Sequence, residues 1–146
     1  MEKKNFQQGF TMIELMIVVV IIGILAALAV MTFEQYSVRS KVKEGLDLVA
    51  PAKNAVSEFF ASKSRLPGGN TSSGLPQASS IGGRYVSTVT VGSSGTITIA
   101  FNSAEPKLSS KSLVLSPTTS SGTTVKWTCG ASGTTLEDKY LPAECR

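Results

Sequence analysis

An unbroken apolar run near the N-terminus constrains this chain more than any other feature. Residues 15–33 carry no charge, and Thr32 is their only polar side chain. As an α-helix this run would be roughly 28 Å long at ~1.5 Å per residue, close to the ~30 Å hydrocarbon thickness of a bilayer. The run therefore predicts a membrane-spanning helix and excludes an ordinary cytosolic globule.

The residues around this run predict its orientation and its fate. Lys3 and Lys4 precede it, and basic residues hold that end of a span in the cytoplasm. The alternative is a secretory signal cleaved after Ala29, because Ala27-Leu28-Ala29 fits the small-residue cleavage pattern. The run is longer than the ~7–15 residues of a usual signal core, and no proline or cluster of turn-forming residues interrupts the chain between it and Ala50. These two features favour a helix that is retained and continues beyond the span.

Glu14 directly precedes the apolar run. A carboxylate carried to the bilayer centre costs roughly 2.5–3.5 kcal/mol on insertion scales, so an acid at this position indicates a function with a charged partner. The alternative is that Glu14 lies among the lipid headgroups, where it costs little.

Residues 9–27, with the sequence GFTMIELMIVVVIIGILAA, resemble the start of a type IV prepilin of the type IVa subclass. The resemblance implies that residues 1–9 are a leader and that residues 10–33 form the span and the core of a filament. It implies that a membrane prepilin peptidase cuts between Gly9 and Phe10 and then N-methylates Phe10. It also implies that Glu14 neutralises the Phe10 amine of a neighbouring subunit during assembly.

Elementary electrostatics supports this pairing. Cleavage would create an amine about one helical turn from Glu14, and neither charge is easily solvated among packed apolar helices. Pairing across subunits would satisfy both charges and would penalise wrong axial registers. Gly23 and Ala27 form a small-xxx-small pair that permits close helix approach, and incidental small residues are the alternative. Met31 stands where many type IVa pilins carry Pro, so a break of the helix driven by Pro is in doubt.

The rest of the chain predicts a head built from a helix and a sheet. Residues 34–65 form an amphipathic pattern that continues the first helix. A loop is expected over 66–84, and alternating apolar and polar residues over 85–128 predict four short antiparallel strands. The expected fold class is α+β: a long N-terminal helix, transmembrane in its first half, packs its second half against a four-stranded antiparallel sheet, as in the pilin fold. The apolar helix positions are Val38, Val42, Leu46, Val49, Val56 and Phe60.

Residues 129–146 form the predicted C-terminal loop. With the N-terminus inside the cell, the compartment beyond the membrane is oxidising, which favours a disulfide between Cys129 and Cys145 over two free thiols. Such a loop of about 15 residues adds about 3 kcal/mol in the chain-entropy model. In pilins of this kind the loop faces outward, and in some it contacts a host receptor. Separately, Asn70-Thr71-Ser72 fits a glycosylation sequon.

The composition excludes several classes of protein. The chain has no His, which removes His-based acid–base chemistry and His metal ligation, and two Cys are too few for a structural zinc site. We therefore expect no catalytic residue, no metal and no cofactor. A net charge of +4 is mild. A DNA-binding patch would have to use scattered cations, for which a solvated surface is the alternative: Lys107, Lys111, Lys126, Lys139 and Arg146.

These observations predict a structural subunit, not an enzyme, that polymerises with itself into type IV pili used for surface adhesion, twitching motility or DNA uptake. It would be stored among lipids of the inner membrane and then moved by the inner-membrane assembly machinery and its ATPases into an extracellular pilus of a Gram-negative-type bacterium. The alternatives are a minor pilin, a type II secretion pseudopilin and, less favoured, a DNA-binding pilus component. A host surface receptor is a further expected partner, and DNA is a weaker one.

Overall fold

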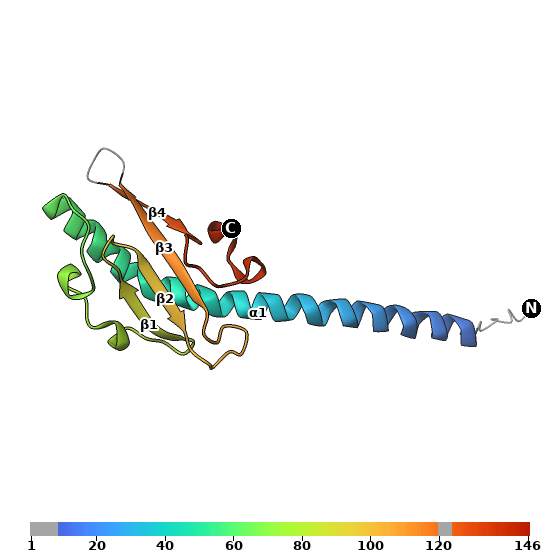
Figure 1. Cartoon of the computed structure of the whole chain (residues 1–146). Coiled ribbons are helices and arrows are strands. Elements are labelled where there is room, and N and C mark those ends of the chain that lie inside the picture. The colour runs from blue at the N-terminus through green and yellow to red at the C-terminus, as the bar shows by residue number, and fades with distance from the viewer. Residues whose placement is uncertain (1–8, 120–123) are drawn as a thin grey trace, which may run out of the picture. The chain divides into compact units, whose positions relative to one another are not determined.

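The computed structural model describes residues 9–119 and 124–146 (Figure 1). Most of the predicted leader, residues 1–8, lies outside this described part, as do residues 120–123. The chain divides into two units, residues 1–34 and residues 35–146. One uninterrupted helix, α1 (Met12–Lys63), contributes to both units and continues through Pro51.

The described part of the N-terminal unit is mainly an apolar helix that no described residue of the chain covers. Its most apolar 18-residue window has a mean hydropathy of 3.0, and none of that window is buried. Among the described residues, α1 is the one helix long and apolar enough to cross a membrane. The large apolar side chains that are exposed between Phe10 and Tyr36 are 45% to 87% accessible. This surface needs lipid or other helices to cover it.

The head contains one antiparallel sheet of four strands in the order β1-β2-β3-β4. The strands are β1 (Val86–Val91), β2 (Ile97–Phe101), β3 (Ser112–Thr119) and β4 (Val125–Cys129). The second half of α1 packs against this sheet, and their apolar side chains form one core (Figure 1). The predicted α+β fold class, a long helix against a four-stranded antiparallel sheet, is confirmed.

The face of α1 that enters the core has buried residues at alternating spacings of four and three. Two of them, Gly45 and Ala52, were not among the predicted core positions, and the predicted Leu46 and Phe60 are only half-buried. A Cβ atom at Gly45 would lie 3.2 Å from Phe101 Cε1 and 3.3 Å from Ile99 Cγ2. The absence of a side chain at Gly45 therefore lets the helix and the sheet approach closely. The buried positions are Val38, Val42, Gly45, Val49, Ala52 and Val56.

A single side chain closes the outer edge of β1. Asn70 is only 9% exposed, and its Nδ2 donates hydrogen bonds to the carbonyl oxygens of Val89 and Pro76, each at 3.1 Å. Its Oδ1 accepts a hydrogen bond of 2.7 Å from the backbone N–H of Val91. The contacts to Val89 and Val91 replace those of a neighbouring strand, and together with the bond to Pro76 they use both amide hydrogens. The folded head therefore does not offer Asn70 as a glycan acceptor, and the sequon interpretation fails on burial.

Candidate functional site

The N-terminal end of α1 is closed by reciprocal hydrogen bonds between Thr11 and Glu14. The Thr11 backbone N–H and hydroxyl both donate to Glu14 Oε2, at 2.9 Å and 2.8 Å. The Glu14 backbone N–H donates back to Thr11 Oγ1 at 3.3 Å. This arrangement is a capping box, in which Thr11 is the cap and Glu14 is the third helical residue. The Thr-x-x-Glu spacing signals it in the sequence, but the prediction treated Glu14 only as a charge.

The predicted cleavage junction lies just before this cap. Gly9 and Phe10 belong to no helix or strand, and both are exposed, with Phe10 87% accessible. A Cβ atom built on Gly9 would meet nothing within 4 Å. The structure thus places an uncovered peptide bond next to the first turn of α1, where Glu14 also lies.

The predicted helix-contact residues Gly23 and Ala27 are one turn apart on the exposed part of α1. A Cβ atom at Gly23 would also meet nothing within 4 Å, so none of the described residues uses that close approach. Five neighbouring large side chains line a shallow apolar groove on the same helix at the spacing of a helix-packing surface. They are Ile13, Met16, Ile17, Val20 and Ile21.

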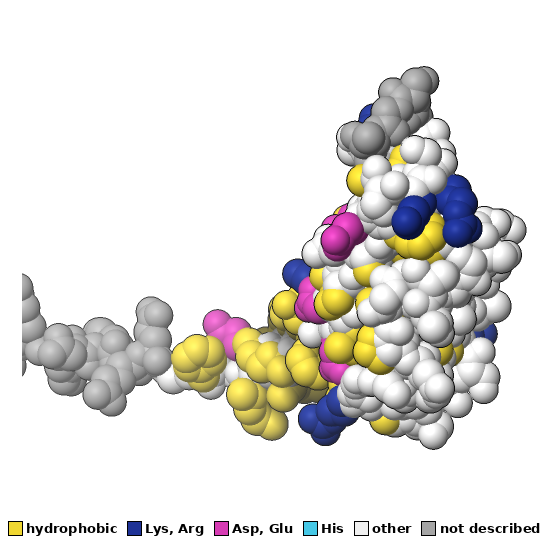
Figure 2. Space-filling model, turned by 90° about the vertical axis from the view of Figure 1, so that its left-hand side faces the viewer, with side chains coloured by type: hydrophobic (Ala, Val, Ile, Leu, Met, Phe, Trp, Pro, Cys, Tyr) yellow, Lys and Arg dark blue, Asp and Glu magenta, His cyan; other side chains and the backbone are white. Residues whose placement is uncertain are grey.

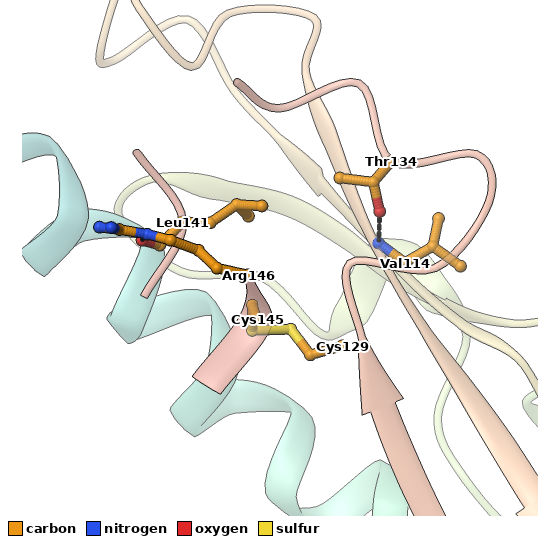
Figure 3. Close-up of a disulfide and its surroundings, with 6 residues drawn as sticks. All are labelled: Val114, Cys129, Thr134, Leu141, Cys145 and Arg146. Carbon is orange, nitrogen blue, oxygen red and sulfur yellow. Dashed lines mark hydrogen bonds between the residues drawn. A yellow bond between two sulfur atoms is a disulfide. The ribbon is translucent and has the colours of Figure 1, made fainter. Parts of the chain in front are cut away.

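The C-terminal segment is joined to the sheet by a disulfide between Cys129 and Cys145 (Figure 3). Cys129 is the last residue of β4, and Cys145 lies in the short 3₁₀ turn Ala143–Cys145. The Cα atoms of the two cysteines are 4.6 Å apart. Arg146 Nε donates to the carbonyl oxygen of Leu141 at 3.2 Å, and the N–H of Val114 donates to Thr134 Oγ1 at 3.1 Å (Figure 3). The segment is therefore held by covalent and polar contacts at several points.

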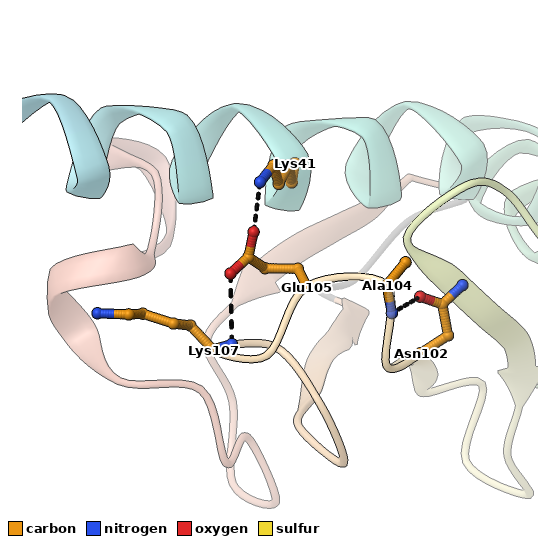
Figure 4. A network of polar contacts seen from close by, with 5 residues as sticks. All are labelled: Lys41, Asn102, Ala104, Glu105 and Lys107. Atoms are coloured by element: carbon orange, nitrogen blue, oxygen red, sulfur yellow. Dashed lines mark hydrogen bonds and ion pairs between the residues drawn. The ribbon is translucent and has the colours of Figure 1, made fainter.

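An ion pair joins the loop between β2 and β3 to α1 (Figure 4). Lys41 Nζ on the helix contacts Glu105 Oε2, and the ammonium also lies 5.2 Å from the centre of the Tyr85 ring. The hydrogen bond from Lys41 lowers the pKa of Glu105 below its ordinary value, and the same bond raises the pKa of Lys41. Glu105 Oε1 also accepts a 3.4 Å hydrogen bond from the backbone N–H of Lys107.

The predicted DNA-contact residues do not gather as one group. Lys107, Lys111 and Lys139 all act electrostatically on Glu137, whose pKa they lower, with the hydrogen bond from Lys139 as the largest cause. Lys126 instead lies on β4. Arg146 donates to Leu141, which directly follows the turn that carries Lys139, but Arg146 is not among the residues that act on Glu137. Within residues 9–119 and 124–146, no group of three His, Cys, Asp or Glu side chains is placed to hold a metal ion.

These features define a class of protein: a subunit in which an uncovered apolar helix carries a small α+β head. The head surface seen in Figure 2 is mostly uncharged and polar, in line with the Ser- and Thr-rich sequence. An apolar helix of this kind is stable in lipid or among copies of itself.

Comparison with known proteins identifies the family. Residues 38–146 match the model of the pilin family of bacterial filaments, and residues 4–30 match the prokaryotic N-terminal methylation motif. Fimbrial protein EcpC of Eikenella corrodens is 38% identical, with 98% of this chain and 93% of that protein covered. Type IV major pilin protein PilE of Neisseria gonorrhoeae is 37% identical (97% and 95% covered), and a fimbrial protein of Neisseria meningitidis is 36% identical (97% and 95%). The chain belongs to the pilin family and is a structural filament subunit, which confirms the predicted resemblance.

Proposed function

We propose that this chain is the major structural subunit of a type IV pilus and that it has no catalytic role of its own. The observation that carries the proposal is the uncovered, uncharged helix from Leu15 to Phe33, which requires a filament core or a bilayer around it. The relatives named as major pilin and fimbrial protein support a major subunit over a minor pilin, a pseudopilin or a DNA-binding component. Adhesion, twitching motility or DNA uptake would follow from extension and retraction of the polymer.

Maturation in this proposal removes residues 1–9. A prepilin peptidase cuts between Gly9 and Phe10 on the cytoplasmic side and N-methylates the new Phe10 amine. The methylation motif over residues 4–30 and the exposure of the junction support this step. Gly9 suits it because a side chain there would add bulk next to the bond to be cut.

Assembly transfers the helix over residues 10–33 from inner-membrane lipid to a core of identical helices. Its surroundings stay apolar in both states, so the net transfer cost is modest, and an assembly ATPase supplies the direction. Gly23 and Ala27 allow close contact between helices in that core. The head then forms the outside of the filament: the part of α1 that ends at Lys63, the loop after it, the strands β1 to β4 and the disulfide loop that follows Cys129. That outer surface is where a host receptor would bind.

Glu14 has two roles in this proposal, and they can be separated by mutation. Glu14→Gln keeps an acceptor for the capping box but removes the charge that would pair with a neighbour's Phe10 amine. Thr11→Val removes the capping hydroxyl, worth about 1 kcal/mol of helix stability, but keeps the charge. We expect Glu14→Gln to insert in the membrane and to form few or no pili, whereas Thr11→Val still assembles. Glu58→Gln on the head is the matched control. Normal piliation of Glu14→Gln together with loss in Thr11→Val would assign Glu14 to capping alone.

The direct test is mass analysis of the N-terminus of the chain recovered from sheared filaments. The expected product begins with N-methylated Phe10, and Gly9→Asp should leave the full-length precursor. A product that begins after Ala29 would establish the secretory-signal alternative and refute the proposal. Absence of the chain from purified fibres would refute the role of major subunit.

A further inference from the structure

Five basic side chains from three segments gather around residues 39–41 of α1. Arg39 Nε donates a 2.7 Å hydrogen bond to the carbonyl oxygen of Lys139, which fixes the 3₁₀ turn Asp138–Tyr140 against the helix. The ion pair of Lys41 fixes the loop between β2 and β3 against the same part of the helix (Figure 4). Lys107 follows Glu105 in that loop and donates its backbone N–H to the Glu105 carboxylate, and Lys107 and Lys111 both act electrostatically on Glu137, the partner of Lys139. We name this group the basic collar: Arg39, Lys41, Lys107, Lys111 and Lys139.

The basic collar has an excess of positive charge. Its two internal carboxylates are Glu105 and Glu137, which pair with Lys41 and Lys139. Five basic and two acidic groups give +3, and counting Glu34, just before this part of α1, gives five minus three, or +2. Asp138 instead lines a separate hollow beside the disulfide. The collar therefore favours anions.

The collar follows closely after the membrane span along α1. Arg39 comes six residues after Phe33 on the same helix, which is about 9 Å at ~1.5 Å per residue. Between them lies Tyr36, which is 73% exposed. An exposed aromatic residue at the end of an apolar span is typical of the membrane–water interface. A headgroup layer is only about 5–7.5 Å deep on each side of the hydrocarbon core, but a basic side chain that follows the span this closely in the sequence is long enough to reach back to it.

We propose that the basic collar binds the phosphates of anionic phospholipids on the head side of the membrane while the subunit is stored there. This rests on the proposed function, because it requires the span to be retained. Each Lys or Arg near an anionic surface contributes about 1 kcal/mol, which is about five-fold in affinity. The binding is additive, salt-sensitive and reversible, so it orients the head without blocking its extraction. DNA fits less well, because a protein that binds a duplex neutralises roughly 6–10 phosphates, more than the net excess of the collar supplies, and Lys126 lies apart from the collar on β4.

The test uses the full chain in lipid nanodiscs made of phosphatidylcholine alone or with one third phosphatidylglycerol. Hydrogen exchange is followed by mass spectrometry in residues 102–111 and 137–141. We expect exchange there to be several-fold slower in the anionic discs, and high salt should remove the difference. Exchange in β1 and β2 should be the same in both discs.

A pair of charge variants makes the test specific. Lys107→Gln with Lys111→Gln should abolish the slowing, whereas the control pair Lys63→Gln with Lys126→Gln removes the same charge elsewhere and should retain it. Equal exchange of the unmodified chain in both discs, or slowing that persists in high salt, would overturn the proposal whatever the variants do. Protection by duplex DNA in neutral discs, without protection by phosphatidylglycerol, would assign the collar to DNA instead. If the chain did not stay in discs of phosphatidylcholine alone, that result would refute the proposed function, which requires a retained membrane span. It would not by itself contradict the binding of phosphates by the collar.

Discussion

Removing the Asn70 side chain tests how the sheet edge is stabilised. Asn70→Ala deletes three hydrogen bonds, two to the carbonyl oxygens of Val89 and Pro76 and one from the N–H of Val91. Each hydrogen bond contributes about 0.5–1.5 kcal/mol net, so the free energy of unfolding should fall by about 3 kcal/mol if the freed groups of the strand edge stay unpaired. Water that hydrogen-bonds to these groups reduces the loss to about 2 kcal/mol. For a head of this size about 1 kcal/mol corresponds to about 4 °C, which gives a melting temperature lower by roughly 8–12 °C.

Trp127 is the only tryptophan of the chain and lies on β4, at the opposite edge of the sheet from Asn70. Its fluorescence during heating of the full chain in detergent micelles therefore reports unfolding of the whole head. The matched control is Asn54→Ala, at an exposed position of α1, which should change the melting temperature little. Hydrogen exchange at the Val91 amide should also accelerate in Asn70→Ala. A melting temperature within about 2 °C of the unmodified chain would refute the strand-edge role.

Asn70→Asp adds a pH signature to the same experiment. An aspartate keeps the acceptor for the Val91 N–H but turns an oxygen toward two carbonyl oxygens, so burial raises its pKa in the folded head. The folded state then holds its proton more tightly than the unfolded state does. Stability should be highest below the ordinary Asp pKa of about 4, and it should fall as the pH rises from there through the raised pKa of the folded head. If the stability of Asn70→Asp did not change with pH in that range, the side chain at position 70 would be accessible to water and not buried.

Three further perturbations address the core, the ion pair and the disulfide. Gly45→Ala places a Cβ atom 3.2–3.3 Å from three side-chain atoms of the sheet. The resulting overpacking costs about 1–3 kcal/mol, which outweighs the gain in helix propensity of about 1 kcal/mol, so the melting temperature of the head should fall. Gly23→Ala is the control and should leave the melting temperature of the head unchanged. Lys41 lowers the pKa of Glu105, so the ion pair stabilises the folded head above pH 4.5, the unshifted pKa of Glu105. This stabilisation is lost as the pH falls below 4.5 through the lowered pKa. The urea concentration at the unfolding midpoint should therefore change less with pH in this acidic range for Glu105→Gln than for the Glu58→Gln control, which keeps the ion pair. Replacing Cys129 and Cys145 by Ser should cost about 3 kcal/mol by thermal unfolding, and an unchanged melting temperature would contradict the chain-entropy account.

The sequence predicted the fold where periodicity is carried by large apolar residues. Val38, Val42, Val49 and Val56 were expected in the core and are buried. Gly45 escaped prediction because a residue without a side chain adds nothing to an apolar pattern, although close packing against the sheet depends on it. The apolar pattern of β3 covers only residues 113–115, because Ser116 and Pro117 carry no strand signal. Pairing with β4 extends the strand to Thr119.

Polar residues were predicted less well, because their roles depend on partners that are distant in the sequence or on a local motif. Asn70 fits a sequon by its neighbours, but its contacts with β1 come from residues 19 and 21 positions away. The basic collar likewise depends on packing that brings residues 107, 111 and 139 to residues 39 and 41. Thr11 was predictable from its spacing to Glu14, because Thr-x-x-Glu is the capping-box pattern, but the prediction assigned Glu14 a charge role alone.

The two units bury their apolar surfaces in different ways, and for this reason mutations in the two units should affect different properties of the protein. The head buries its core within one chain, so changes at Gly45 or Asn70 act on its unfolding at any subunit concentration. The N-terminal helix buries nothing of its own, so changes at Glu14 or Gly23 act only where lipid or a second copy is present. A subunit with a weakened head but an intact N-terminus should therefore still assemble below its melting temperature. A Glu14→Gln subunit should melt normally and fail to assemble. If Asn70→Ala stopped assembly at temperatures where its head is folded, the contacts that build the filament could not lie in the helix alone.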